Sequence, residues 1–193
     1  MRGAVAVTDI LRIDPERWAL LGLVADLGLP DAWIAAGFVR NAIWDALHGR
    51  APQRITGDID VIWFDADCTS VERDREIEAK LLASARHADW SVKNQARMHV
   101  RNGDAPYSCS TDAMRYWPET ATAVAARRMP DGTCLIAAPF GLDDLLGGRI
   151  RPTPHFAGIR RATFLGRVHG KQWLEKWPCL TLMQAAENPD LSG

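Results

Sequence analysis

The segment RITGDIDVIWFDAD, residues 54–67, most constrains the fold of this chain. Acidic residues alternate in it with β-branched and aromatic residues, a pattern typical of a strand whose two faces meet different environments. Asp58 and Asp60 share one face, and Ile59 and Val61 share the other. The alternation predicts a strand that is buried on one side and carries two carboxylates on the other.

A second pattern lies about twenty residues upstream, in AAGFVRN, residues 35–41. We expect an apolar strand over residues 33–36, a turn at Gly37 and a helix from about residue 39 to residue 47. The start of such a helix presents free backbone N–H groups and the positive end of the helix dipole, which together favour an anion. Arg40, on the first turn, is suited to bidentate contact with phosphate.

Hydrophobic periodicity predicts further elements on both sides of these segments. We expect a helix from its N-cap Asp14 to Gly28, a charged helix over residues 71–87, and a strand over residues 89–100. Pro118 opens a helical pattern over residues 119–129, followed by a turn, a short strand at residues 133–138, and short helices in FGLDDLLGG and HGKQWLEKW.

This order of elements, without a linker, predicts one α/β (α+β) domain with a mixed central sheet flanked by helices. The single domain is expected to span residues 1–193. Its core is expected at about residues 14–147, and a C-terminal helical extension at about residues 148–180.

Composition argues against several classes of protein. The 23 Lys and Arg against 24 Asp and Glu give a net charge of −1, so the chain lacks an overall basic field for a long nucleic acid. The stretch of residues 149–167 has five arginines and no acid, and it fits either phosphate contact or a solvated basic face. Four scattered cysteines argue against a zinc cage and fit a reducing cytoplasm. No apolar run approaches the roughly 20 residues of a membrane-spanning helix, so we expect a cytoplasmic protein that does not contact membranes.

The two aspartates have the spacing of a magnesium site. Strand residues separated by one position project to the same side, with Cα atoms about 6–7 Å apart. Mg²⁺ commonly binds one or two protein carboxylates and completes its shell with water and substrate phosphate, and Mn²⁺ accepts the same ligands. Charged residues on a solvated strand face are common without any metal, so it is the neighbouring glycine turn that favours a metal site. We therefore predict that Asp58 and Asp60 are metal ligands and catalytic residues.

The two motifs in this order resemble the polymerase-β-like nucleotidyltransferase superfamily, which includes the CCA-adding tRNA enzymes. The corresponding strings are GFVRNAIWD, residues 37–45, and GDIDVIWF, residues 57–64. From about residue 33 to residue 178 the chain also resembles a small bacterial branch, through WSVKNQARMH, APYSCSTDAMRYWPETATAVAAR, APFGLDDLLGGRIRPTP and KQWLEKWP. The resemblance implies the polymerase-β-like fold, with a nucleoside triphosphate held at Gly37, Phe38, Arg40 and Asn41.

Two departures from the superfamily pattern bear on activity. Phe38 stands where the glycine turn usually has a second small residue, so that the backbone would approach a triphosphate less closely. The segment SVKNQARMHV, residues 91–100 of the next expected strand, lacks the acid that completes the second metal site in superfamily members. A substitute third ligand could come from Asn94, Gln95 or Asp112, or from Asp65 farther along the first strand. Asp112 fits a helix cap equally well.

The strand expected at residues 89–100 also carries basic side chains. Lys93, Arg97 and His99 would lie on one of its faces. Lys93 and Arg97 could contact nucleotide phosphates, although an ion-paired or solvated face fits them as well. His99 is a secondary candidate for a general base because histidine titrates near neutral pH.

We expect a metal-dependent nucleotidyltransferase that moves a nucleoside monophosphate from a nucleoside triphosphate to the hydroxyl of an unidentified acceptor. Near-neutral charge favours a small molecule or a protein over RNA as that acceptor. The missing third acid leaves open a catalytically silent nucleotide-binding or partner-binding module. A metal-dependent phosphohydrolase would use the same two aspartates with water as the acceptor.

Overall fold

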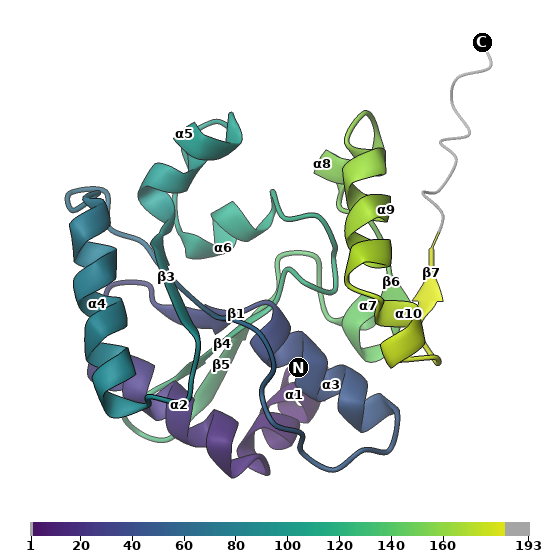
Figure 1. Ribbon diagram of the computed structural model, residues 1–193, viewed down its shortest axis with the longest axis horizontal. Helices are drawn as coiled ribbons and strands as arrows, with labels where there is room; N and C mark the ends of the chain where they lie inside the picture. The colour runs from purple at the N-terminus through teal and green to yellow at the C-terminus, as the bar shows by residue number, and fades with distance from the viewer. Residues whose placement is uncertain (1, 184–193) are drawn as a thin grey trace.

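The computed structural model describes residues 2–183, which form a five-stranded mixed sheet with helices on both faces (Figure 1). The strand order is β3-β2-β1-β4-β5. Strands β2 and β3 are parallel, and the other neighbours are antiparallel. The strands are β1 (Trp33–Ala35), β2 (Ile59–Trp63), β3 (Trp90–Asn94), β4 (Ala125–Arg128) and β5 (Cys134–Ala137). The expected mixed central sheet flanked by helices is confirmed.

Four helices cover one face of the sheet: α1 (Arg2–Arg12), α2 (Pro15–Asp26), α3 (Gly37–Leu47) and α4 (Val71–Ser84). Two separate groups of short elements complete the fold (Figure 1). The first group is a 3₁₀ turn (Gln95–Arg97), α5 (Met98–Asn102) and α6 (Ser110–Met114). The second is α7 (Asp143–Leu146), β6 (Arg149–Ile150), α8 (Pro154–Ala157), α9 (Arg161–Gly170), α10 (Trp173–Lys176) and β7 (Thr181–Leu182).

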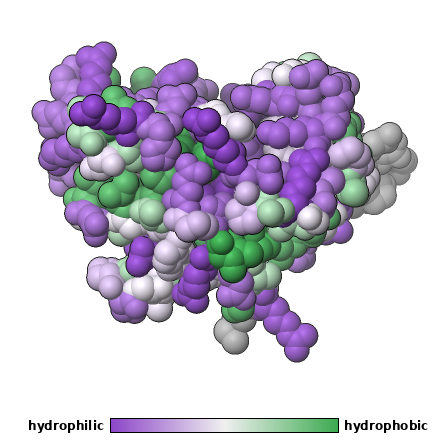
Figure 2. Space-filling view, turned by 60° about the horizontal axis from the view of Figure 1, so that its bottom comes forward, coloured by the Kyte–Doolittle hydropathy of each residue, from purple (hydrophilic) through white to green (hydrophobic). Residues whose placement is uncertain are grey.

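The surface is mostly hydrophilic on the side turned toward the viewer in Figure 2, with a notch between two lobes at its upper edge. No helix among residues 2–183 is both long and apolar enough to span a membrane.

Alternation along β2 decides which side chains reach the core. Ile59, Val61 and Trp63 are at most 1% exposed and join the cluster packed under α1 to α4. Ile62 points the other way, into a smaller cluster with Trp33 and alanines of β1, β4 and β5. Asp60 therefore lies on the face away from the four covering helices.

Local signals fix several helix ends as the sequence predicts. Asp14 caps α2 by accepting a hydrogen bond from the Arg17 backbone N–H (3.0 Å), and Pro15 follows in the first turn. Gly28 has a φ of 61°, a left-handed conformation that ends this helix at little cost. Helix α1 was not expected from the sequence, yet Val7 and Leu11 are fully buried against the core.

Two expected elements are wrong. The strand expected at residues 89–100 ends at Asn94, because the Asn94 side chain accepts from the Ala96 N–H (2.9 Å) and starts the 3₁₀ turn. Lys93, Arg97 and His99 consequently do not share a strand face. The helix expected at residues 119–129 is instead a turn followed by β4, because pairing with β1 and β5 overrides the helical periodicity of this segment.

Helix α4 packs along the edge strand β3, and its side chains accept hydrogen bonds from the backbone of that strand. The Glu78 carboxylate accepts a hydrogen bond from the Val92 backbone N–H (2.9 Å), and Asp74 accepts one from that of Asn94 (3.1 Å). Asp74 is 2% exposed, accepts from the Trp63 indole N–H (2.8 Å) and forms an ion pair with Arg97. The carboxylates satisfy edge groups that would otherwise be free to pair with another strand.

The substitution Asp74→Ala should destabilise the fold by about 3–5 kcal/mol, because it leaves a buried indole N–H, a backbone N–H and a guanidinium without their partner. Urea unfolding measures the change. Glu76→Ala removes a 60% exposed carboxylate from the same helix and should shift stability by no more than about 0.5 kcal/mol. Equal effects of the two substitutions would contradict the role given to Asp74.

Candidate active site

Asp58 and Asp60 flank the first residue of β2. Asp58 is exposed and lies just before the strand, whereas Asp60 is half-buried inside it. Burial raises the pKa of Asp60 to about 6, and the negative charge of Asp58 contributes to the increase. The cations of Arg40, Lys93 and Arg167 oppose this shift without cancelling it. The two acids are close enough to repel each other, and Asp60 holds its proton to a higher pH than a free aspartate does.

Asp60 opens into a cleft of about 240 Å³ between the sheet and the two groups of short elements. Its floor comes from β2, β3 and the turn between β1 and α3, and its walls come from the 3₁₀ turn, α5, the segment before β4, and α9. The lining residues are Ala36, Asp60, Ile62, Ser91, Lys93, Gln95, Met98, Asn102, Trp117, Pro118, Thr122 and Arg167.

The strand-to-helix turn begins one residue earlier than the sequence predicts. Gly37 is already the first residue of α3, and Ala36 before it has the positive φ of 54°. Phe38 is 1% exposed and packs in the core, so its ring does not cover the turn. The position that departs from a glycine-rich turn is therefore Ala36, which holds a backbone conformation that favours glycine.

Arg40 is more enclosed than a phosphate-binding arginine was expected to be. Its side chain donates to the Thr122 hydroxyl (2.8 Å) and to the Asn41 amide oxygen (2.9 Å), and the residue is 7% exposed. The guanidinium carbon lies 4.9 Å from the ring centre of Trp44 and 4.4 Å from that of Trp173. Burial lowers the pKa of Arg40 to about 10, so it stays charged, and it joins α3 to α10 behind the turn.

Arg167 and Glu119 form a part of the cleft that the sequence did not single out as a site. Glu119 is fully buried, and one of its carboxylate oxygens accepts from Arg167 Nε at 3.0 Å. The Arg167 side chain is 38% exposed and lines the cleft with Asp60. The only sequence signal was the acid-free stretch of residues 149–167. In that stretch Arg149 and Arg151 pair with Asp144.

The other expected nucleotide contact, Lys93, does line the cleft. Its ammonium group also lies 3.6 Å from the Glu78 carboxylate, so part of its charge is already paired. In the parallel register of β2 and β3, Lys93 is opposite Ile62 and Ser91 is opposite Asp60. Lys93 and Asp60 therefore share one face of the sheet.

The four candidates for a third metal ligand are dispersed. Asn94 is fully buried and uses its amide on the Asp65 and Cys68 backbone, and Asp112 accepts from Ser108. Gln95 lines the cleft, with its amide N–H donated to the Lys93 carbonyl (3.0 Å). Asp65 lies beyond the far end of β2 from Asp58 and accepts from the Asp67 N–H (2.9 Å). Of these four residues the structure brings only Gln95 to the cleft.

The acids fit a cation whose shell is completed by a ligand. Within residues 2–183, no group of three or more His, Cys, Asp or Glu side chains is arranged to hold a metal ion. Asp60 lines an open cleft and Asp58 lies two residues before it, and two such carboxylates match Mg²⁺, which commonly takes one or two protein ligands and binds water and phosphate at its other positions. A bound cation would favour the ionised form of Asp60 and so offset the cost of burying its charge.

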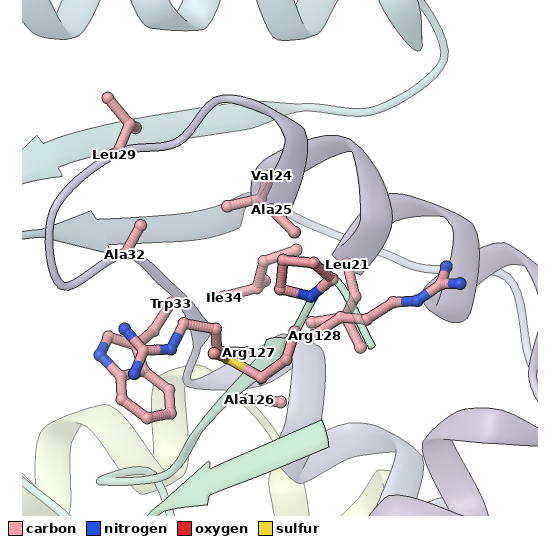
Figure 3. Close-up of a pocket in the computed structure, with 12 residues that line it drawn as sticks. Leu21, Val24, Ala25, Leu29, Ala32, Trp33, Ile34, Ala126, Arg127 and Arg128 are labelled. Carbon is pink, nitrogen blue, oxygen red and sulfur yellow. The ribbon is translucent and has the colours of Figure 1, made fainter. Parts of the chain in front are cut away.

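A separate apolar pocket of about 190 Å³ lies beside α2, at the ends of β1 and β4 (Figure 3). Its walls include Leu21, Val24 and Ile34, and the Arg127 guanidinium lies 4.3 Å from the Trp33 ring centre at its rim. It shares no lining residue with the cleft at Asp60.

Residues 22–182 match the model of a protein family described as Nucleotidyltransferase. The chain belongs to this family. No curated protein matches it. A protein whose NMR structure was described as revealing a CCA-adding enzyme head domain is 38% identical, with a TM-score of 0.81 and coverage of 93% of this chain and 95% of that one.

Two CCA-adding enzymes share the fold of this chain at lower identity. The Thermotoga maritima CCA-adding enzyme, solved with tRNA, is 17% identical with a TM-score of 0.60, and coverage is 93% of this chain and 42% of that one. The Bacillus stearothermophilus CCA-adding enzyme, solved with CTP, is 18% identical with a TM-score of 0.50, and coverage is 87% and 40%. The chain thus spans about two fifths of each enzyme. The polymerase-β-like nucleotidyltransferase fold inferred from the two motifs is confirmed.

Because its pKa is raised, Asp60 should make the fold less stable as pH rises from about 3, where it is protonated in both states, to above 6, where it is ionised in both. Asp60→Asn should therefore stabilise the protein by about 1–2 kcal/mol at pH 8, and the gain should vanish near about pH 3. Urea unfolding in metal-free buffer at several pH values tests this. A constant difference between the two proteins across this range would contradict the raised pKa.

Proposed function

We propose that this protein transfers a nucleoside monophosphate from a nucleoside triphosphate to a hydroxyl group, in a reaction that requires Mg²⁺ or Mn²⁺. The observation that carries the proposal is the pair Asp58 and Asp60: Asp60 lines a cleft together with Ala36, at the turn that opens α3, and Asp58 is close enough to raise its pKa. Membership of the nucleotidyltransferase family supports the reaction class. A cytoplasmic location is part of the same proposal.

Some residues of the site would bind the metal, and others would contact or position the substrate. Asp58 and Asp60 would hold the cation, which supplies Lewis-acid stabilisation of charge on the transferred phosphate. Lys93 and Arg167 line the same cleft as Asp60 and present positive charge to the nucleotide phosphates. Glu119 is a positioning residue, since its hydrogen bond fixes the Arg167 guanidinium. Arg40 stabilises the turn that opens α3, because its guanidinium donates a hydrogen bond to the Thr122 hydroxyl and lies over the Trp173 ring.

The transfer proceeds by in-line displacement at the α-phosphorus. The acceptor oxygen forms a bond to phosphorus, the bond from that phosphorus to the bridging oxygen breaks, and pyrophosphate leaves with the electron pair. The hydroxyl proton passes to water. Protons and the cation compete for the Asp60 carboxylate, so the affinity for the cation should fall as the pH drops below about 6.

The proposal also extends to the identity of the substrates. Related enzymes were solved with CTP and with tRNA. By that likeness a nucleoside triphosphate is the donor, held at the turn of Gly37, Phe38, Arg40 and Asn41 by backbone groups and by the supporting side chains. Because the chain spans only about two fifths of these enzymes, their tRNA acceptor does not transfer to it directly. The near-neutral charge favours a small molecule or a protein.

The dispersal of the third-ligand candidates motivates a second candidate function, a nucleotide-binding module without turnover. In this case the protein binds a nucleoside triphosphate with the same two carboxylates and releases it unchanged. A phosphohydrolase would be distinguished from both by release of inorganic products without attachment to any acceptor.

Purified protein incubated with each α-labelled nucleoside triphosphate, Mg²⁺ or Mn²⁺ and a cell extract should attach label to an acceptor and release pyrophosphate. Asp58→Asn should lower the rate by at least about 100-fold, because it removes a ligand of the required cation. Asp67→Asn is the matched control, since Asp67 is an exposed acid in the loop after β2, and it should leave the rate unchanged. Attachment that survives Asp58→Asn would contradict the proposed role of the pair.

A further inference from the structure

A second polar cavity, of about 220 Å³, lies between α3, α10 and the loop that precedes β2. In Figure 1 this loop runs from the end of α3 back to β2, and α10 lies beside α3. The lining residues are Arg17, Asn41, Asp45, Arg50, Gln53, Arg54, Thr56 and Lys176. We call this cavity the basic pocket, because four of its eight lining residues are cations and one is an acid.

Pairing within the basic pocket leaves two of its cations free. Arg17 pairs with Asp14, and Arg50 pairs with Asp45 at 3.1 Å. Within residues 2–183, neither Arg54 nor Lys176 has a carboxylate within ion-pair distance. Two unpaired cations in one concavity repel each other, and an anion between them would relieve that repulsion.

The walls of the basic pocket are fixed by contacts that do not depend on a ligand. Arg17 donates to the Gln53 carbonyl (3.2 Å), and Arg50 donates to the Lys176 carbonyl (2.8 Å). The Trp177 indole N–H donates to Asp45 (2.8 Å) and its ring packs on Trp44, so the end of α10 is anchored to α3. The backbone of the loop and of α10, which carries Arg54 and Lys176, is therefore fixed before any anion arrives, which lowers the entropic cost of binding.

The basic pocket adjoins the candidate active site without being part of the cleft. Thr56 on its rim is two residues before Asp58, and two residues of extended chain span at most about 7 Å. Asn41, also on the rim, accepts the hydrogen bond from Arg40 behind the turn. The two cavities share no lining residue. An anion bound here would lie close to the acidic pair and outside the cleft at Asp60.

We propose that the basic pocket is a second phosphate-binding site, formed around Arg54 and Lys176, which binds a phosphoryl group of a substrate. Guanidinium and ammonium groups match the charge and hydrogen-bonding capacity of phosphate oxygens. That this phosphoryl group belongs to a substrate rests on the proposed nucleotidyl transfer. It comes either from the leaving end of the nucleotide or from an acceptor that carries a phosphate of its own. Binding of phosphate by the pocket can be measured without turnover.

The test measures binding of inorganic phosphate by calorimetry and NMR in metal-free buffer, using the full chain. The double variant Arg54→Gln/Lys176→Gln removes both unpaired cations. The matched control Arg75→Gln/Lys80→Gln removes two positive charges from the exposed side of α4, outside the pocket. We expect wild type and control to bind phosphate alike, with resonances of the basic pocket shifting, and the double variant to bind at least tenfold more weakly.

Titration with CTP, one nucleoside triphosphate, then identifies the source of the phosphoryl group. If the double variant loses affinity for CTP as well as for phosphate, the pocket binds the leaving end of the nucleotide. If its affinity for CTP is unchanged, the pocket binds the phosphate of an acceptor. The proposal is overturned if wild type binds no phosphate at millimolar concentration, or if the double variant and the control bind it equally. These outcomes are independent of label transfer, so the pocket and the proposed reaction can fail separately.

Discussion

The parallel pairing of β2 with β3 is the constraint on which the rest of the site depends. Its register sets Asp60 beside Ser91 and Ile62 beside Lys93, so carboxylate and cation share one face of the sheet. The opposite set of side chains, Val61, Trp63 and their β3 neighbours, enters the core under α4. A shift by one residue would bury Asp60 and expose the apolar set, so the same hydrophobic burial that holds the sheet together also orients the acid.

The cleft is assembled from both ends of the described chain. The acidic pair and the turn come from the first third, whereas Arg167 and Trp173 come from the C-terminal helices. A buried network joins them: Arg40 lies between Trp44 and Trp173, and Glu119 holds Arg167. Buried charges of this kind contribute little net stability on average, but removing one partner is costly. They make the geometry of the cleft depend on the docking of α9 and α10.

The sequence predicted the parts of the fold that rest on local chemistry. Short sequence motifs predict the cap at Asp14, the start of α3 near Gly37 and the alternation around Ile59. The superfamily was inferred from the last two of these motifs, and the mixed sheet follows from it. Residues 119–129 could not be predicted in this way, since their helical periodicity gives way to pairing with β1 and β5. The end of β3 at Asn94 depends on a single side-chain cap. Tertiary contacts decided both outcomes.

The site was harder to predict than the fold. Asp58, Asp60, Lys93 and Gln95 follow from sequence spacing, and Lys93, Gln95 and Asp60 do line one cleft. Arg167 lies 107 residues after Asp60, and only the docking of α9 brings it to the cleft. Arg40 looked exposed by its place on the first turn, but α10 covers it with Trp173. Burial of this kind is set by segments distant in the sequence.

The central claim is that Asp58 and Asp60 jointly bind a divalent cation beside the turn that opens α3. A crystal structure with Mn²⁺ and a non-hydrolysable analogue of CTP, recorded with anomalous scattering, tests it most directly. The account predicts a manganese peak contacted by both carboxylates and by phosphate oxygens of the nucleotide. Manganese bound elsewhere with this pair empty, or two carboxylates pointing away from the bound phosphates, would contradict it.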